Sequence, residues 1–139
     1  SPDEFPGATK YWEDRVHKIK IPSRQEVSIP RFSAARLIDI DQYESETKFL
    51  NRLVLATRAP YEQVVAWYRS RLPSFCVVEE PKAKQLVTMA ESCVCDGVSL
   101  AENAGCLFTS VRNVTISAAP DGTEHFFGDF LTVIEIAYK

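Results

Sequence analysis

Residues 53–73 read LVLATRAPYEQVVAWYRSRLP, a short apolar strand that leads directly into one strongly patterned helix. Apolar side chains in its second part recur at i, i+3, i+4, i+7 and i+11, which places them on one stripe of a helix. They are Tyr61, Val64, Val65, Tyr68 and Leu72. Such a stripe has to face a core. The sequence therefore predicts a helix between Pro60 and Pro73 that covers a sheet.

Both ends of this predicted helix carry suitable residues. Pro60 fits the first helical position, because its missing N–H would have no partner there. Pro73 ends the helix, because a residue that precedes proline is disfavoured in the α region. Trp67 lies about 120° from the centre of the apolar stripe. We expect Trp67 to pack beneath an N-terminal or loop segment, and the alternative is a ligand or partner surface.

Most of the remaining chain has strand patterns. Residues 49–57 should form a central strand, because their apolar side chains fall on both faces. Pro120, Asp121 and Gly122 mark a hairpin turn before the last strand, in which Phe130, Thr132, Ile134, Ile136 and Tyr138 share one face. The strands expected after the helix cover residues 75–78, 85–95, 106–120 and 123–139.

Other segments give weaker patterns. Residues 1–10 are expected to form an extended N-terminal segment, followed by a strand over 16–21. Residues 26–30 resemble a brief strand. Residues 31–41 suggest a helical turn and then a strand with Leu37 on the opposite face from Ile38 and Ile40. Residues 98–105 fit either a single helical turn closed by Gly105 or a plain loop.

These elements predict one α+β domain over residues 1–139. Its expected form is a curved, mainly antiparallel sheet that ends in a C-terminal β meander, with one principal amphipathic helix on one face.

Composition excludes several protein classes. The 139 residues are 45% hydrophobic, which favours a packed core over disorder. A net charge of −3 with interspersed charges does not suggest nucleic-acid binding. No apolar run reaches the roughly 18 to 20 residues of a membrane span. Because the chain begins at Ser1 without an initiator methionine, we expect a fragment or mature protein from which an upstream signal or lipid anchor can have been removed.

The four cysteines are Cys76, Cys93, Cys95 and Cys106. Neighbours two apart on a strand point to the same face, so Cys93 and Cys95 are poor partners for each other. We predict disulfides Cys76–Cys93 and Cys95–Cys106, which would indicate an oxidising compartment. Unrelated free thiols and a zinc site are the alternatives, although the C-x-C spacing argues against zinc.

No catalytic motif stands out. His17 has no companions at fixed spacing and is expected to be a solvated side chain. His125 and Asp129 are the residues that an enzyme of this kind would use, and they would have to converge with another titratable group in a cleft. No residue pattern predicts a metal or a cofactor.

One resemblance adds to this reading. PGA at residues 6–8, and the helix pattern of Thr57, Val64, Val65, Trp67, Tyr68 and Leu72, resemble small uncharacterised exported bacterial domains. The resemblance covers about the first half of the chain. It implies a periplasmic, cell-envelope or secreted lipoprotein-like setting and no known catalytic residue, and it does not extend to the cysteines.

Our leading hypothesis is a non-enzymatic binding domain for a protein or small ligand. The expected surface is the sheet face that the helix leaves open, or the rim near Trp67, with Tyr11 and Trp12 as further candidates. The alternatives are a small enzyme with a cleft between sheet and helix, and a cytosolic metal-binding module with Cys93 and Cys95 as ligands.

Overall fold

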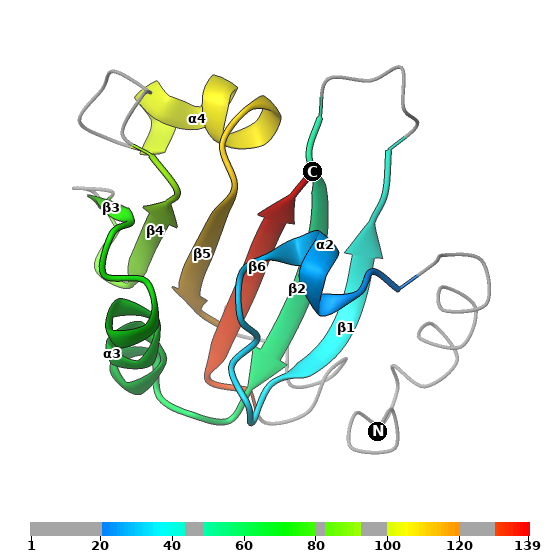
Figure 1. The fold of residues 1–139 in the computed structure, drawn as a ribbon. Helices are drawn as coiled ribbons and strands as arrows, with labels where there is room; N and C mark the ends of the chain where they lie inside the picture. Colours follow the sequence, from blue (N-terminus) through cyan, green and yellow to red (C-terminus); the bar gives the residue numbers. More distant parts are fainter. Residues whose placement is uncertain (1–20, 44–48, 80–82, 93–99, 120–129) are drawn as a thin grey trace.

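The structure is a computed structural model that describes residues 21–43, 49–79, 83–92, 100–119 and 130–139, with the backbone alone of 100–104 (Figure 1). The described strands form one antiparallel sheet in the order β1-β2-β6-β5-β4-β3. The elements are α2 (Arg24–Val27), β1 (Arg36–Asp41), β2 (Asn51–Thr57), α3 (Tyr61–Arg71), β3 (Cys76–Glu79), β4 (Leu86–Ala90), α4 (Leu100–Thr109), β5 (Asn113–Ala118) and β6 (Thr132–Tyr138).

The main core lies between one face of the sheet and the helices α2 and α3, which cover that same face (Figure 1). Period-two alternation sends one set of strand residues to this face. The core members are Val27, Ile29, Phe32, Ile40, Leu53, Leu55, Val64, Tyr68, Val87, Met89, Val114, Ile116, Ile134, Ile136 and Tyr138. This arrangement confirms an α+β fold with a helix over an antiparallel sheet.

Helix α3 and the strand before it agree with the sequence prediction. Val64 and Tyr68 are 0% exposed, and Tyr61, Val65 and Leu72 pack partly buried against the same core. Pro60 is one position off, because its ψ of 150° makes it the cap before the helix rather than the first helical residue. Strand β2 is paired on both sides, with β1 and with β6, as expected of a strand inside the sheet.

The C-terminal meander is also present. Strands β3, β4, β5 and β6 follow one another in the sheet, each antiparallel to the next. In β6, Ile134, Ile136 and Tyr138 face the core, whereas Glu135 lies on the opposite face and pairs with Arg52 at 3.9 Å. Among the described residues no helix has the length and apolar character needed to cross a bilayer.

Leu37 and Ile38 lie on opposite faces as predicted, but the predicted face of Ile40 was wrong because β1 contains a bulge. Leu37 pairs with Leu55, and the register then shifts before Asp39 pairs with Val54. An extra residue at a bulge reverses the alternation that follows it. Leu37 and Ile40 therefore both pack on the main core, while Ile38 joins a small cluster on the other face.

The strand predicted over residues 26–30 is absent there, because α2 occupies Arg24–Val27. Ser23 caps this helix: its hydroxyl accepts a hydrogen bond of 3.2 Å from the N–H of Glu26. A serine followed three residues later by glutamate is the sequence signature of such a cap. The helix was not predicted, because one helical turn has too few residues to show a period.

The strand predicted from Cys106 was also wrong at its start. Helix α4 continues through Thr109, with Gly105 inside it, and β5 begins only at Asn113. The Asn113 side chain donates two hydrogen bonds of 2.8 Å, to the carbonyls of Leu107 and Val111, and so satisfies carbonyls at the end of the helix. The fold thus has a second helix about as long as α3.

Several predictions fall on segments outside the described residues. These are the N-terminal segment with Tyr11, Trp12 and His17, the hairpin turn, and the positions of Cys93, Cys95, His125 and Asp129.

Candidate functional site

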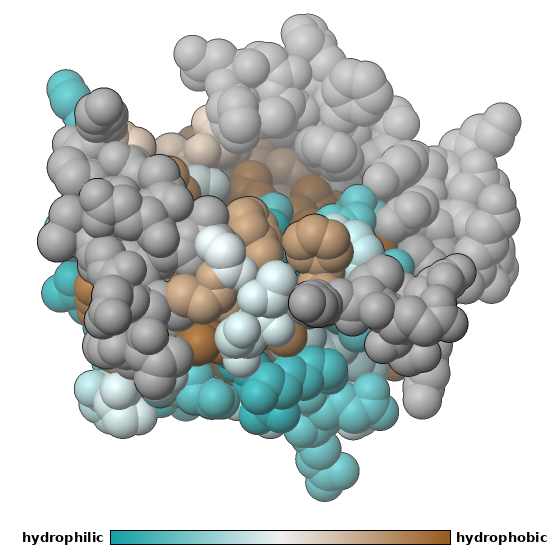
Figure 2. Space-filling view, turned by 90° about the horizontal axis from the view of Figure 1, so that it is seen from above, coloured by the Kyte–Doolittle hydropathy of each residue, from teal (hydrophilic) through white to brown (hydrophobic). Residues whose placement is uncertain are grey.

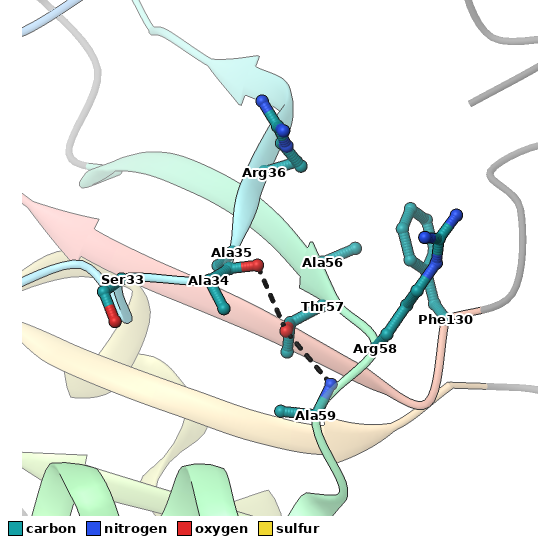
Figure 3. Close-up of a pocket in the computed structure, with 9 residues that line it drawn as sticks. All are labelled: Ser33, Ala34, Ala35, Arg36, Ala56, Thr57, Arg58, Ala59 and Phe130. Atoms are coloured by element: carbon teal, nitrogen blue, oxygen red, sulfur yellow. Dashed lines mark hydrogen bonds between the residues drawn. The ribbon is translucent and has the colours of Figure 1, made fainter. Parts of the chain in front are cut away.

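The segment before β1 separates two pockets, and both contain arginines. The first, which we call the arginine pocket, has a volume of about 530 Å³ and lies where β2 ends (Figure 3). Its lining residues are Ser33, Ala34, Ala35, Arg36, Ala56, Thr57, Arg58, Ala59 and Phe130. The size falls in the range of about 300 to 1,000 Å³ that is typical of small-ligand sites.

Thr57 holds the backbone of the arginine pocket in place. Its buried hydroxyl donates a hydrogen bond of 3.3 Å to the carbonyl of Ala34 and accepts one of 3.1 Å from the N–H of Ala59 (Figure 3). The turn before β1 is closed by the Ala35 N–H, which donates to the Phe32 carbonyl at 3.0 Å. One side chain therefore joins the two backbone segments that form the walls.

A second threonine supports the same frame from β6. The hydroxyl of Thr132, 0% exposed, donates to the carbonyl of Ala59 at 2.7 Å, and the N–H of Leu131 donates to the Thr57 carbonyl at 3.1 Å. These bonds fix the path of the chain between β2 and α3. The pocket is therefore largely preformed, which reduces the ordering cost of binding.

The register of the sheet brings two arginines to the same side of the pocket. Arg36 on β1 is the cross-strand partner of Ala56, and Arg58 follows Ala56 by two residues. In Figure 3 the two arginine side chains point toward the same side with Ala56 between them, whereas Ser33 points the other way. Both arginines therefore belong to the lining of this pocket, together with the small side chain of Ala56.

The second pocket, which we call the tryptophan pocket, lies on the helix-covered side and has a volume of about 790 Å³. Its lining residues are Pro22, Ser23, Arg24, Val27, Ser28, Ile29, Pro30, Arg31, Ser33 and Trp67. Ser33 contributes to both pockets.

Trp67, a candidate from the sequence, lines the tryptophan pocket and also packs against neighbouring aromatic side chains. Its ring makes edge contacts with Phe32 at 5.4 Å and with Tyr68 at 4.8 Å between centroids, and the Arg71 guanidinium lies 4.8 Å from the Trp67 centroid. Phe32 belongs to the loop before β1, so the expected packing beneath a loop segment is what the structure contains. Trp67 is only half-buried, and its side chain also lines the tryptophan pocket.

Three aromatic side chains are exposed at the other end of the sheet, where α4 lies. Phe49 is 55% exposed and its ring contacts Tyr43 at 5.4 Å, while the Arg52 guanidinium lies 4.8 Å from the Phe108 ring. Figure 2 looks onto this end and shows hydrophobic residues near its centre, with hydrophilic residues along one side. These three side chains offer apolar contact area, and none of them lines either of the two pockets.

Burial raises the pKa of three tyrosines, Tyr68, Tyr138 and Tyr61, above the ordinary value. The described residues contain no group of three or more histidine, cysteine, aspartate or glutamate side chains placed to hold a metal. Between α3 and the sheet, where an enzyme cleft was the alternative, Val64 and Tyr68 are fully buried.

Cys76 and Cys106 are both disulfide-bonded, and no described cysteine is a free thiol. Cys76 opens β3 and packs against Ala90, Leu107 and Val111 at the α4 end of the sheet. The predicted connectivity with Cys93 and Cys95 stays a prediction.

The two arginines of this pocket were not predicted as site residues. Arg36 and Arg58 lie 22 positions apart, and only the strand register brings them to either side of Ala56. One signal was available: Arg58 lies in the three-residue link between a strand and a helix, where loops commonly carry binding residues.

Comparisons with known proteins add no family. No protein-family model, no curated protein and no solved structure matches this chain.

Proposed function

We propose that this chain is a non-enzymatic binding domain that holds a small ligand in the arginine pocket. The observation that carries the proposal is a cavity of about 530 Å³ whose walls are tied together by the buried hydroxyls of Thr57 and Thr132. Preformed concave sites of this size are the usual places where folded domains bind small molecules.

The lining chemistry favours binding over catalysis. Among the described residues that line the pocket, the polar side chains are two hydroxyls and two guanidinium groups. Arginine stays charged throughout the physiological range and therefore cannot act as a general base. The Thr57 hydroxyl is already committed to two hydrogen bonds. Catalysis by a general base or an activated nucleophile would require a side chain of another type at this position.

The arginine pocket is a better candidate than the tryptophan pocket because more of its frame is fixed. Its walls belong to the ends of β1 and β2, to the segments that adjoin them and to Phe130, two residues before β6, and side-chain hydrogen bonds join the segments. The tryptophan pocket is lined mainly by a four-residue helix and the loop after it. Short helices of this kind depend on their surroundings for stability.

We also propose a periplasmic, cell-envelope or secreted location. The disulfide-bonded state of Cys76 and Cys106 supports an oxidising compartment, since cytosolic thiols are kept reduced. The resemblance to exported bacterial domains agrees with this location.

The test is a screen of small fragments of mixed charge, followed by ¹H–¹⁵N correlation spectra of the protein. At least one fragment should shift the amides of Arg58 and Ala59. Ala34→Phe places a ring at the mouth of the pocket at an exposed position and should abolish these shifts. Ala66→Phe, at an exposed position on α3, is the matched control and should leave them intact. Fragments that bind only at other sites, or equally well in Ala34→Phe, would contradict the proposal.

A further inference from the structure

The tryptophan pocket contains positive charge that no described residue neutralises. Arg24 and Arg31 both line it, and they are its only charged lining residues among those described. In the described part of the chain neither arginine has an ion-pair partner, whereas three other arginines each pair with a glutamate. Glu26, the acidic residue of α2, is not a lining residue and forms no ion pair with either arginine. The pocket is therefore positive within a protein whose net charge is −3.

The polar groups of this pocket that stay available to a ligand are mainly hydrogen-bond donors. The hydroxyls of Ser23 and Ser28 already form hydrogen bonds within the protein. The Ser33 hydroxyl has no hydrogen bond to another described residue. A guanidinium group donates hydrogen bonds and accepts none. The pocket therefore suits an acceptor, and an anionic acceptor forms the strongest hydrogen bonds with arginine.

The rest of the tryptophan pocket is apolar. Val27 and Ile29 are 1% and 4% exposed and belong to the main core, and Pro22 and Pro30 line the pocket beside them. Half-buried Trp67 adds a large ring to the same lining. The volume of about 790 Å³ lies in the range of small-ligand sites. A ligand that fills this pocket therefore needs an apolar part as well as an anionic group.

Two long-range hydrogen bonds hold the segment that forms the pocket. The Arg112 guanidinium donates to the Ser28 hydroxyl at 3.3 Å, which ties the end of α2 to the residue before β5. The backbone N–H of Phe32 donates to the Tyr68 hydroxyl on α3 at 3.1 Å. Residues 29–31 are thus anchored at both ends, although α2 itself is only one turn long.

We infer that the tryptophan pocket is a second binding site, for a small amphipathic anion with its charged group at Arg24 and Arg31 and its apolar part beside Trp67. This site is separate from the arginine pocket and does not depend on the ligand bound there. Arg24 is exposed and Arg31 half-buried, so an anion reaches them from solvent without rearrangement of the core.

The test is isothermal titration calorimetry with 4-phenylbutyrate and phenyl phosphate as probes. At least one of them should bind, and the stronger one separates the carboxylate from the phosphate class. The neutral control is 4-phenylbutanol, which is more apolar than 4-phenylbutyrate and would bind more tightly if the pocket selected only for burial of apolar surface. We expect 4-phenylbutanol, and butyrate without a ring, to bind at least about tenfold more weakly than the better anion.

Variants and spectra assign the binding to this pocket. Arg24→Gln and Arg31→Gln should each weaken anion binding at least about fivefold. Arg69→Gln is the control for loss of one positive charge, because Arg69 is an exposed α3 residue 3.7 Å from Glu79, and it should change affinity by less than about twofold. The bound anion should shift the indole N–H of Trp67 in ¹H–¹⁵N spectra. Melting temperatures report whether each variant is folded.

Three results would overturn the inference. They are equal loss of affinity in Arg69→Gln and Arg24→Gln, binding of 4-phenylbutanol as tight as that of 4-phenylbutyrate, and an unshifted Trp67 indole N–H at millimolar concentrations of both anions. The proposal for the arginine pocket is read from other signals, the amides of Arg58 and Ala59, so either site can fail while the other stands.

Discussion

The hydroxyl of Tyr68 on α3 accepts a hydrogen bond of 3.1 Å from the backbone N–H of Phe32 in the loop before β1. Both side chains are buried, and the Trp67 ring makes an edge contact with each of them. The helix that covers the sheet therefore also positions the loop that separates the two pockets. Loop position and pocket shape depend on the same buried contact.

Loss of this hydrogen bond should destabilise the fold. Tyr68→Phe leaves the buried N–H of Phe32 without its partner, which costs about 1 to 3 kcal/mol of the free energy of unfolding. Urea unfolding measures the change. Tyr43→Phe, at an exposed ring, is the control and should stay within about 0.5 kcal/mol of wild type. Equal stability of Tyr68→Phe and Tyr43→Phe would contradict the role of this bond.

Stability should fall in alkaline solution. Burial raises the pKa of Tyr68 above the ordinary value of 10.0, so the folded protein keeps a proton that the unfolded chain releases. Below the unfolded pKa this stabilisation is fully present, and it is lost as pH rises through the folded pKa. The free energy of unfolding should drop by about 1.4 kcal/mol per pH unit for this residue once pH exceeds 10.

Tyr68→Phe supplies the control for the pH dependence. Phenylalanine has no proton to lose, so this variant should show a shallower fall between about pH 8 and pH 11. Buried Tyr138 and partly buried Tyr61, whose pKa values are also raised by burial, should account for part of the remaining slope. An identical slope in the two proteins would show that Tyr68 is not protected from ionisation.

Thr57 should be necessary for the shape of the arginine pocket. Thr57→Val keeps the volume but removes both hydrogen bonds of the hydroxyl, to Ala34 and Ala59, which costs about 1 to 3 kcal/mol. Thr109→Val also loses a hydroxyl bond, to the Gly105 carbonyl, at an exposed site where water replaces it. The control should therefore lose much less stability and leave the amide shifts of Arg58 and Ala59 unchanged. Similar spectra at these two amides in the two variants would argue against a pocket frame held by Thr57.

The cysteines can be tested by mass spectrometry. Alkylation of the denatured protein without reductant should label neither Cys76 nor Cys106, because both are disulfide-bonded, and prior reduction should label both. Disulfide-linked peptides would also give the connectivity. Reduction should lower the free energy of unfolding by about 2 to 5 kcal/mol. Labelling of either cysteine before reduction would contradict the bonded state and remove the support for export.

Strong periodicity explains which parts of the fold were predictable. Helix α3 repeats its apolar residues over three turns, and burial alternates along β6 from Thr132 to Ile136. Long regular patterns of this kind indicate both the element and its buried face. The same reasoning correctly assigned Val64 and Tyr68 to the core and placed Ile134 and Ile136 on one face of the last strand. It was wrong for Phe130, which was expected on that face but packs in the other cluster with Ile38 and Ala56.

Short or irregular features were not predictable in this way. One helical turn at α2 shows no period, and the bulge after Leu37 reverses an alternation that was otherwise read correctly. In α4, the β-prone residues that follow Cys106 remain helical to Thr109, because Leu107 packs with Ala90 and Val111. Tertiary packing there outweighs local propensity.

The candidate site depended on register, which the sequence does not specify. The pairing of β1 with β2 places Arg36 beside Ala56. It also allows the hydrogen bond from the Thr57 hydroxyl to the Ala34 carbonyl. Trp67 was predictable as an unusual residue because it lies off the apolar stripe of a well-defined helix. The arginines had no comparable pattern.

A crystal structure of the protein grown with a fragment that shifts the amides of Arg58 and Ala59 would test the central claim most directly. We expect the fragment in the arginine pocket, in contact with Phe130. A fragment bound beside Trp67 with the arginine pocket empty, or no bound fragment at a concentration that saturates the amide shifts, would contradict the account.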